Sequence, residues 1–152
     1  MTKDCLFCRI ARHEISAHVV YEDKRLLAFL DIHPIRSGHM QIMPKEHYPY
    51  FDDMPGAICA SIVRLGQQLA GAMKQIYGVP RVAFLFSGGD IAHAHAHVVP
   101  MHEETDITSR RYIAEDVVTF RSTPRASDTD LAPRAIELRE AFASSVRTKR
   151  AR

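Results

Sequence analysis

One long amphipathic helix constrains the fold of this chain more than any other feature of the sequence. Over residues 55–77, apolar side chains recur at spacings of three and four and form one stripe: Ile58, Ile62, Leu65, Leu69, Met73 and Ile76. Asp53 is the expected N-cap, Pro55 suits the first turn, and Gly78 suits the C-terminal stop. Because a helix with one apolar face must cover another layer, we predict that it packs on a sheet.

Five short segments have the alternation and the apolar content of β-strands. They cover residues 17–23, 25–31, 37–45, 81–87 and 93–100. The first two follow each other closely and predict a hairpin. Three strands, one helix and two strands leave too few crossovers for a parallel sheet. We therefore predict an α+β domain with an antiparallel sheet of roughly five strands and a long central helix.

Helices are also predicted at both ends of the chain. Residues 5–12 place apolar side chains on one helical turn and predict a short N-terminal helix. The Pro-, Ser- and Asp-rich residues 121–133 predict a linker, and residues 134–146 predict a C-terminal helix that packs against the body or another subunit. The chain is thus expected to comprise a core domain over 1–120, followed over 121–152 by the linker, the helix and a basic tail.

The composition is that of an ordinary globular protein. The 152 residues are 46% hydrophobic and 25% charged, which suits one domain with a real core. No apolar run approaches the ~20 residues that cross a bilayer, and the N-terminal segment lacks the features of a signal peptide, so we expect a cytosolic protein without a membrane partner. The net charge is +2, and no basic stripe is interleaved with aromatic residues. Nucleic acid is therefore not an expected partner.

Residues 93–100 read HAHAHVVP and place three histidines at alternate positions. Alternate side chains of a strand share a face, so His93, His95 and His97 are expected on one side and small residues on the other. Imidazole titrates near neutrality, binds metals and can act as a nucleophile. Two chemistries remain open at this point. One is a metal site built from the row, and the other is phosphoryl chemistry in which one ring attacks and its neighbours position the substrate.

Cys5 and Cys8 form a C-x-x-C motif, which is a moderate signal for a metal site. An odd number of cysteines in a chain without a secretion signal argues against a disulfide framework. The pair can therefore bind a metal, given two more ligands, or form buried thiols. Cys59 lies beside the apolar stripe of the long helix and is expected to be a small core residue.

Four stretches match one known family in order and roughly in spacing: CLFCRI, VYED, LLAFLDIHPIRSGHMQIMPKEH and HAHAHVVP. Through them, about residues 4–101 resemble the histidine triad family, specifically its Hint-like branch of nucleotide hydrolases and transferases. The resemblance implies a histidine triad domain over residues 1–120, and a homodimer whose sheets join edge to edge. It also implies attack at the α-phosphate of nucleoside phosphoramidates or (di)nucleoside polyphosphates.

The resemblance assigns different roles to the three histidines of the catalytic row. His95 corresponds to the nucleophile, which forms a covalent nucleotidyl-histidine intermediate that water then releases. His97 would hold the phosphate together with the backbone amides of Gly88 and Gly89. His93 is the first histidine of the row and need not share in the chemistry.

The nucleoside pocket is carried over position by position from the same resemblance. The residues that correspond to the apolar walls around the base are Leu6, Phe7, Ile10, Phe29 and Ile32. Asp31 corresponds to the carboxylate that accepts hydrogen bonds from the ribose hydroxyls. The loop before the triad is shorter than in the family, and Asp90 lies near the position of a hydroxyl residue there. A carboxylate repels phosphate unless it is protonated or paired, and it cannot donate as the family's hydroxyl residue does. Ser87 and the loop amides are therefore expected to supply hydrogen-bond donors in its place.

The start of the chain resembles bacterial Hint-like proteins in which a zinc ion is held by four residues. The corresponding residues are Cys5, Cys8, His47 and His93. This is a closed set of the structural kind, and no catalytic metal or organic cofactor is expected. Two alternatives stay open: a nucleotide-binding regulatory or scaffold protein with little turnover, and a metal-dependent hydrolase that gathers the three triad histidines around one ion.

Overall fold

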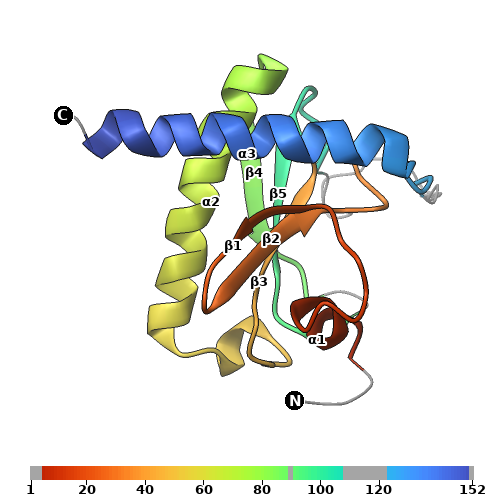
Figure 1. The fold of residues 1–152 in the computed structure, drawn as a ribbon, viewed down its shortest axis with the longest axis vertical. Helices are drawn as coiled ribbons and strands as arrows, with labels where there is room; N and C mark the ends of the chain where they lie inside the picture. Colours follow the sequence, from red (N-terminus) through yellow and green to blue (C-terminus); the bar gives the residue numbers. More distant parts are fainter. Residues whose placement is uncertain (1–4, 89–90, 108–122, 151–152) are drawn as a thin grey trace, which may run out of the picture.

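The computed structural model describes residues 5–88, 91–107 and 123–150, of which 145–150 by backbone only. Its centre is an antiparallel sheet of five strands in the order β1-β2-β3-β5-β4 (Figure 1). The strands are β1 (Val19–Glu22), β2 (Leu26–Leu30), β3 (Met40–Pro44), β4 (Arg81–Phe86) and β5 (Ala96–Met101). The predicted α+β class, with an antiparallel sheet and helices, is therefore confirmed.

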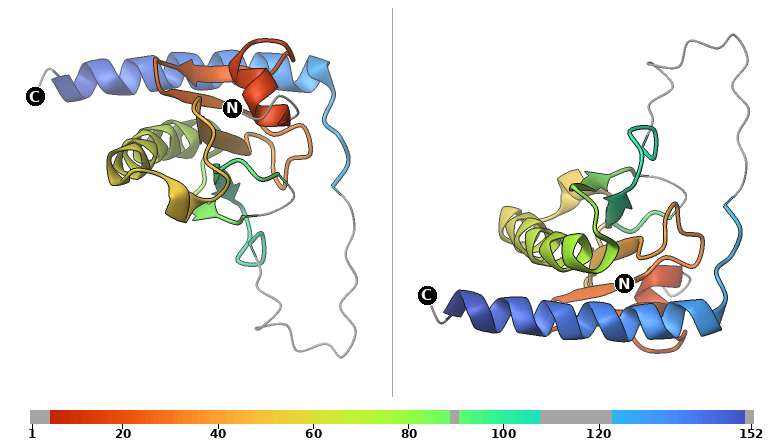
Figure 2. Two further views of the ribbon diagram at one scale, coloured as in Figure 1. Left: turned by 90° about the horizontal axis from the view of Figure 1, so that it is seen from below. Right: turned by 90° about the horizontal axis from the view of Figure 1, so that it is seen from above.

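Two long helices cover one face of this sheet, and a short helix lies on the other. The helices are α1 (Leu6–Ala11), α2 (Gly56–Tyr77) and α3 (Asp128–Arg150), with a 3-10 helix, η1 (Phe51–Asp53), before α2. α2 packs on β3, β5 and β4, and α3 packs against α2, β1 and β2 (Figure 2). None of the helices in the described part of the chain has the length and hydropathy of a membrane span.

The alternation of side chains along β2 and β3 divides the buried residues between the two faces. On the face of α2 and α3, the larger core contains Leu26, Ala28, Leu30, Met40 and Ile42. On the opposite face, a smaller cluster contains Phe7 and Ile10 of α1 together with Leu27, Phe29 and Met43. All five residues of β2 are buried because both of its faces are covered. The smaller cluster forms the floor of the candidate site described below.

The beginning of α2 differs from the sequence prediction, while its end agrees. Pro55 is the N-cap, and the predicted cap Asp53 belongs to η1, where its carboxylate accepts a hydrogen bond from the Tyr50 amide at 3.1 Å. At the other end, Gly78 adopts the left-handed conformation, with φ at 62°, that the predicted C-terminal stop requires.

The predicted linker over residues 121–133 is wrong from Asp128 onward, because α3 begins there. Ser127 caps this helix, since its Oγ accepts a hydrogen bond from the Asp130 amide at 3.2 Å. Leu131 is buried in the main core, and this burial outweighs the linker-like composition. A serine followed three residues later by an acid was the available signal for this helix start.

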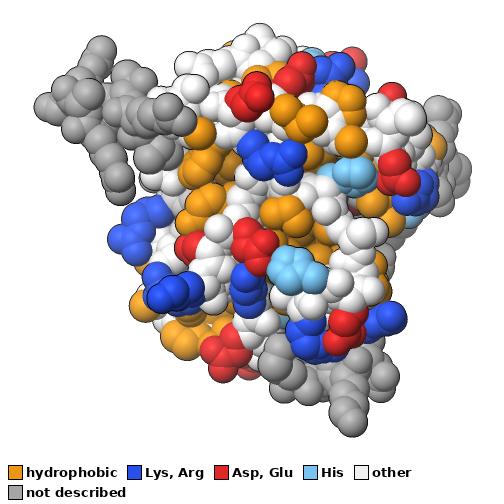
Figure 3. All heavy atoms as spheres, in the orientation of Figure 1, with side chains coloured by type: hydrophobic (Ala, Val, Ile, Leu, Met, Phe, Trp, Pro, Cys, Tyr) orange, Lys and Arg blue, Asp and Glu red, His pale blue; other side chains and the backbone are white. Residues whose placement is uncertain are grey.

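Charge is evenly distributed over the face that carries α3. Figure 3 shows acidic and basic side chains interspersed there with exposed apolar groups.

Candidate functional site

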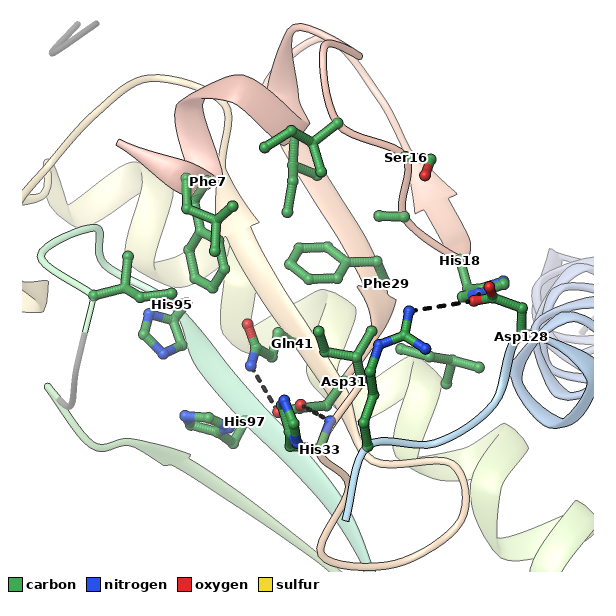
Figure 4. Close-up of a pocket in the computed structure, with 18 of the residues that line it drawn as sticks. Phe7, Ser16, His18, Phe29, Asp31, His33, Gln41, His95, His97 and Asp128 are labelled. Carbon is green, nitrogen blue, oxygen red and sulfur yellow. Dashed lines mark hydrogen bonds and ion pairs between the residues drawn. The ribbon is translucent and has the colours of Figure 1, made fainter. Parts of the chain in front are cut away.

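One row of side chains across the centre of the sheet forms the floor of a cavity of about 690 Å³. Phe29 of β2 lies opposite Gln41 of β3, which in turn lies opposite His97 of β5. His95 and Asp31 line the same cavity (Figure 4). The register of three strands thus places an aromatic ring, an amide and an imidazole in line beneath one space.

His95 is the best-oriented imidazole in this cavity. Its Nδ1 lies 2.7 Å from the carbonyl oxygen of His93. A carbonyl can only accept, so Nδ1 carries the proton of the neutral ring and Nε2 keeps its lone pair. Phe7 packs edge-on against the ring, with centroids 5.0 Å apart. The side chain is therefore fixed in the tautomer that a nucleophilic imidazole needs.

A chain of hydrogen bonds also fixes the tautomer of His97. The amide of Ile35 donates to Nδ1 of His39 at 3.2 Å, so neutral His39 carries its proton on Nε2. That nitrogen lies 2.9 Å from Nδ1 of His97, which must accept, so the proton of neutral His97 is on Nε2. Nε2 of His97 lies 3.1 Å from Oγ of Ser87. His97 therefore presents a hydrogen-bond donor beside the loop before β5.

Burial keeps both rings of this pair neutral at physiological pH. Desolvation lowers the pKa of His97 to about 4, with smaller contributions from His39 and His95. Desolvation is also the main cause of the lowered pKa of His39, and Asp31 opposes it. Sequence reasoning assigned no role to His39, although its position beside the alternating polar residues of the third strand was a usable signal.

The carboxylate of Asp31 is held from within the protein by two donors. The His33 amide donates to Oδ1 at 2.8 Å, and the Gln41 side-chain amide donates to Oδ2 at 2.7 Å. Only 12% of the Asp31 side chain is exposed. Its orientation at the cavity is therefore set by the end of β2 and by the neighbouring strand. Sequence reasoning missed Gln41, which also alternates with apolar residues along β3.

The five apolar residues predicted to enclose a base all line this cavity: Leu6, Phe7, Ile10, Phe29 and Ile32. The rings of Phe7 and Phe29 meet edge to face with centroids 5.6 Å apart. Leu6 is 43% exposed and Ile32 is 42% exposed, which is high for large apolar side chains. These two walls therefore have uncovered surface that a flat apolar ligand can bury.

The loop that precedes the triad is only partly described. Ser87 lies in the cavity, with its Oγ beside Nε2 of His97. Gly88 has a φ of 60°, so its backbone takes a conformation that favours glycine. Gly89 and Asp90, to which the sequence analysis assigned an anion-binding amide and an unfavourable carboxylate, lie outside the described residues.

A second cluster brings together the four predicted metal ligands, from the start of α1, the loop after β3 and the segment before β5. Sγ of Cys5 and Sγ of Cys8 lie 3.5 and 3.6 Å from Nδ1 of His93. Nδ1 of His47 lies 3.4 Å from Sγ of Cys8 and 3.3 Å from Nδ1 of His93. Zinc bound to sulfur at about 2.3 Å and to nitrogen at about 2.05 Å places tetrahedral ligands about 3.35 Å apart for two nitrogens and about 3.6 Å apart for nitrogen and sulfur. The four separations given above fit these values.

The hydrogen bond of His93 also suits a metal ligand. Its Nε2 lies 2.9 Å from the carbonyl oxygen of Pro44, so Nε2 donates and Nδ1 directs its lone pair toward the cysteines. Desolvation is the main cause that lowers the pKa of His93 to about 4. Burial, followed by the neighbouring Cys5, raises the pKa of the Cys8 thiol and so favours the neutral form. A bound cation would have the opposite effect and favour the thiolate.

The three histidines of the row therefore have three different sets of partners. His93 joins the cysteines, His95 bonds to a carbonyl, and His97 pairs with His39. This arrangement does not favour a single ion held by all three rings.

Known proteins resemble this chain in sequence and in structure. The HIT domain family model matches residues 12–104. An uncharacterised HIT-like protein of Methanocaldococcus jannaschii is 36% identical over 103 residues, which cover 65% of this chain and 80% of that protein. The adenosine 5′-monophosphoramidase of Saccharomyces cerevisiae is 34% identical over 101 residues, which cover 66% of this chain and 64% of that protein. The crystal structure of a Zn-bound histidine triad family protein from Mycobacterium smegmatis has a TM-score of 0.75 at 27% identity, over 95% of this chain and 97% of that one.

Proposed function

The chain belongs to the HIT family, and on that premise we propose that it is a nucleotide hydrolase or transferase that cleaves nucleoside phosphoramidates or (di)nucleoside polyphosphates at the α-phosphate. One observation carries the proposal. The Nδ1 proton of His95 is held by a carbonyl 2.7 Å away, which leaves the Nε2 lone pair for attack. The yeast relative named adenosine 5′-monophosphoramidase supports the reaction class.

The cavity can position a nucleoside monophosphate group against His95. The base would lie between the apolar walls of α1 and β2, where Leu6 and Ile32 have uncovered surface. Asp31, already oriented by Gln41, would accept hydrogen bonds from the ribose hydroxyls. The phosphate would lie at the end of the cavity that carries Ser87 and the Nε2–H of His97.

The proposed reaction has two steps. In the first, Nε2 of His95 forms a bond to the α-phosphorus while the bond from phosphorus to the leaving group breaks, and the leaving group departs with the bonding electron pair and takes a proton from solvent. In the second, water adds to phosphorus and gives up a proton to solvent while the bond to Nε2 breaks, which releases the nucleoside monophosphate. Since most catalysis of phosphoryl transfer comes from position and electrostatics, the donor on His97 contributes by stabilising charge on the phosphate oxygens.

The test is a comparison of His95→Ala with the parent protein. The parent should show a rapid burst of leaving group and, after acid quench, a nucleotide bound to His95 by mass spectrometry. His95→Ala should lose the burst and the adduct, whereas His102→Ala, an exposed histidine outside the cavity, should keep both. Turnover by His95→Ala at the parental rate would refute the proposal. Tight nucleotide binding by the parent without turnover would favour a regulatory or scaffold role instead.

We further propose that Cys5, Cys8, His47 and His93 bind a structural zinc ion. The support is the close grouping of their ligand atoms, which all lie within 4.8 Å of one another, and the Zn-bound relative from Mycobacterium smegmatis. When bound, the ion supplies a cross-link between α1, which lines the base pocket, and the segment that carries His95.

Dimerisation through the open edge of β4 is also part of the proposal. β4 is the last strand of the sheet, and Phe84 is 37% exposed on it. Phe51 of η1, which is 55% exposed, stacks on Phe86 with ring centroids 5.4 Å apart. Exposed aromatic groups beside an edge that no strand of the described residues pairs with suit a second copy of the chain. Light scattering should show a dimer for the parent and a monomer for Phe51→Asp, and a monomeric parent would refute the proposal.

A further inference from the structure

The C-terminal segment borders one end of the cavity. The amide of Ala126 donates to the carbonyl of Ile32 at 2.7 Å, and the hydroxyl of Thr123 donates to the carbonyl of His33 at 3.0 Å. On the other side, Nε2 of His18 lies 3.0 Å from Oδ1 of Asp128. The segment before α3 is thus attached both to the end of β2, next to Asp31, and to the residue before β1.

This attachment places two charged side chains, Arg125 and Asp128, on the cavity wall. Figure 4 shows Asp128 and His18 at the end of the cavity opposite His95, with Phe29 between them. A nucleotide with its phosphate at His95 and its base over Phe29 therefore directs the far edge of the base toward Asp128. The two charged side chains would therefore contact the base and not the atoms that react.

The charges at this end define which base edge fits. Within the described residues, Oδ1 of Asp128 makes both contacts of this carboxylate. It lies 3.0 Å from Nε2 of His18 and 3.6 Å from Nη2 of Arg125. The hydrogen bond from His18, followed by the charge of Arg125, lowers the pKa of Asp128, so the group is ionised at neutral pH. An ionised carboxylate only accepts hydrogen bonds, and a guanidinium only donates them.

We propose that Asp128 and Arg125 form a base-recognition subsite that selects guanine over adenine, an inference that rests on the proposed nucleotide hydrolase function. Guanine presents two neighbouring donors, N1–H and the N2 amino group, beside the acceptor O6. Its donors match the Asp128 carboxylate, and O6 matches Arg125. Adenine presents one amino donor beside N1, whose lone pair would face the carboxylate. Hypoxanthine keeps N1–H and O6 and lacks the amino group, so it falls between the two.

The expected selectivity is moderate because the site is open to water. The Asp128 side chain is 71% exposed, so solvent screens its hydrogen bonds. Preferences of roughly tenfold are typical of one charge-assisted hydrogen bond under such conditions. Specificity of this kind is set by the C-terminal segment, which lies outside the matched family region at residues 12–104.

The test measures the binding of GMP, IMP and AMP to the zinc-loaded full chain by calorimetry. The parent should bind GMP about tenfold more tightly than AMP, with IMP between them. Asp128→Asn keeps an oxygen that can accept from His18 and should abolish this preference by weakening GMP alone. Glu137→Gln is the matched control, because Glu137 is an exposed acid of α3 that pairs with Arg134 and does not line the cavity. It should keep the parental order of affinities.

The outcomes separate this inference from the proposed function. If the parent binds GMP and AMP equally, or if Asp128→Asn weakens both to the same extent with a parental melting temperature, the base-recognition subsite is refuted while the hydrolase proposal stands. If none of the three nucleotides binds, both proposals are refuted. If GMP is preferred but no adduct forms on His95, the subsite stands and the catalytic proposal is refuted.

Discussion

Replacing His97 by glutamine should remove part of the acid sensitivity of this fold. Burial lowers the pKa of His97 to about 4, whereas an unfolded histidine titrates near pH 6.5. The unfolded chain therefore takes up this proton first as the pH falls. The stability that neutral His97 contributes is complete above about pH 6.5 and is lost as the pH falls toward about 4.

The size of the effect follows from these two pKa values. At about pH 5 the linkage amounts to about 2 kcal/mol of lost unfolding free energy relative to neutral pH. His97 lies at the edge of the cavity and is only partly buried, so solvent screening reduces this value, and about 1–2 kcal/mol is expected.

The assay is urea unfolding of the full chain at about pH 7.5 and about pH 5 for the parent, His97→Gln and the control His102→Gln. Acid also releases metal and titrates other groups, but these losses are common to all three proteins. The parent and the control should lose about 1–2 kcal/mol more than His97→Gln between the two pH values. Identical pH dependence for parent and His97→Gln would refute the lowered pKa of His97.

Three further predictions test the metal cluster, the packing of α2 and the attachment of α3. Cys8→Ser should reduce zinc, measured by atomic emission, from about one ion per chain to almost none, while Cys59→Ser should retain it; equal contents would exclude Cys8 as a ligand. Gly66→Ala should cost about 1–3 kcal/mol in urea unfolding, because its Cβ would lie 2.5 Å from a phenylalanine ring of β4. Gly71→Ala, in open space on the same helix, should instead stabilise by about 0.5–1 kcal/mol; equal effects would mean that helix propensity alone decides. Leu138→Ala should cost about 2–5 kcal/mol, since Leu138 is fully buried, and a much smaller loss would mean that α3 is detached in solution.

Local patterns in the sequence predicted the main elements of the fold. The apolar stripe of α2 and its glycine stop were predicted because a helix that covers a sheet repeats its contacts every three or four residues. The order of three strands, one helix and two strands predicted the antiparallel sheet because it leaves too few crossovers for a parallel one. The proposed zinc ligands and the proposed base walls came from the family resemblance, and the structure brings the residues of both sets together.

Such local patterns do not predict contacts between segments that are distant in the sequence. The roles of His39 and Gln41 depend on which strand lies beside which, and a single sequence does not state the register. The same holds for Asp128, whose partner His18 is 110 residues away. The start of α3 was missed for a different reason: its cap has a local signature at Ser127, but the proline and acids around it indicated a linker more strongly.

The one wrong boundary within the histidine row explains why His95 is oriented for attack. The alternation predicted a strand from residue 93, yet β5 begins at Ala96, which is the first residue paired with both β3 and β4. Within a sheet, the His93 carbonyl would be directed to a neighbouring strand. Because the chain is still outside the sheet at this point, held by the Ala94 amide on the Tyr48 carbonyl at 2.7 Å, that carbonyl accepts from Nδ1 of His95 instead. A strand that began earlier would compete for the one acceptor that fixes the tautomer of the proposed nucleophile.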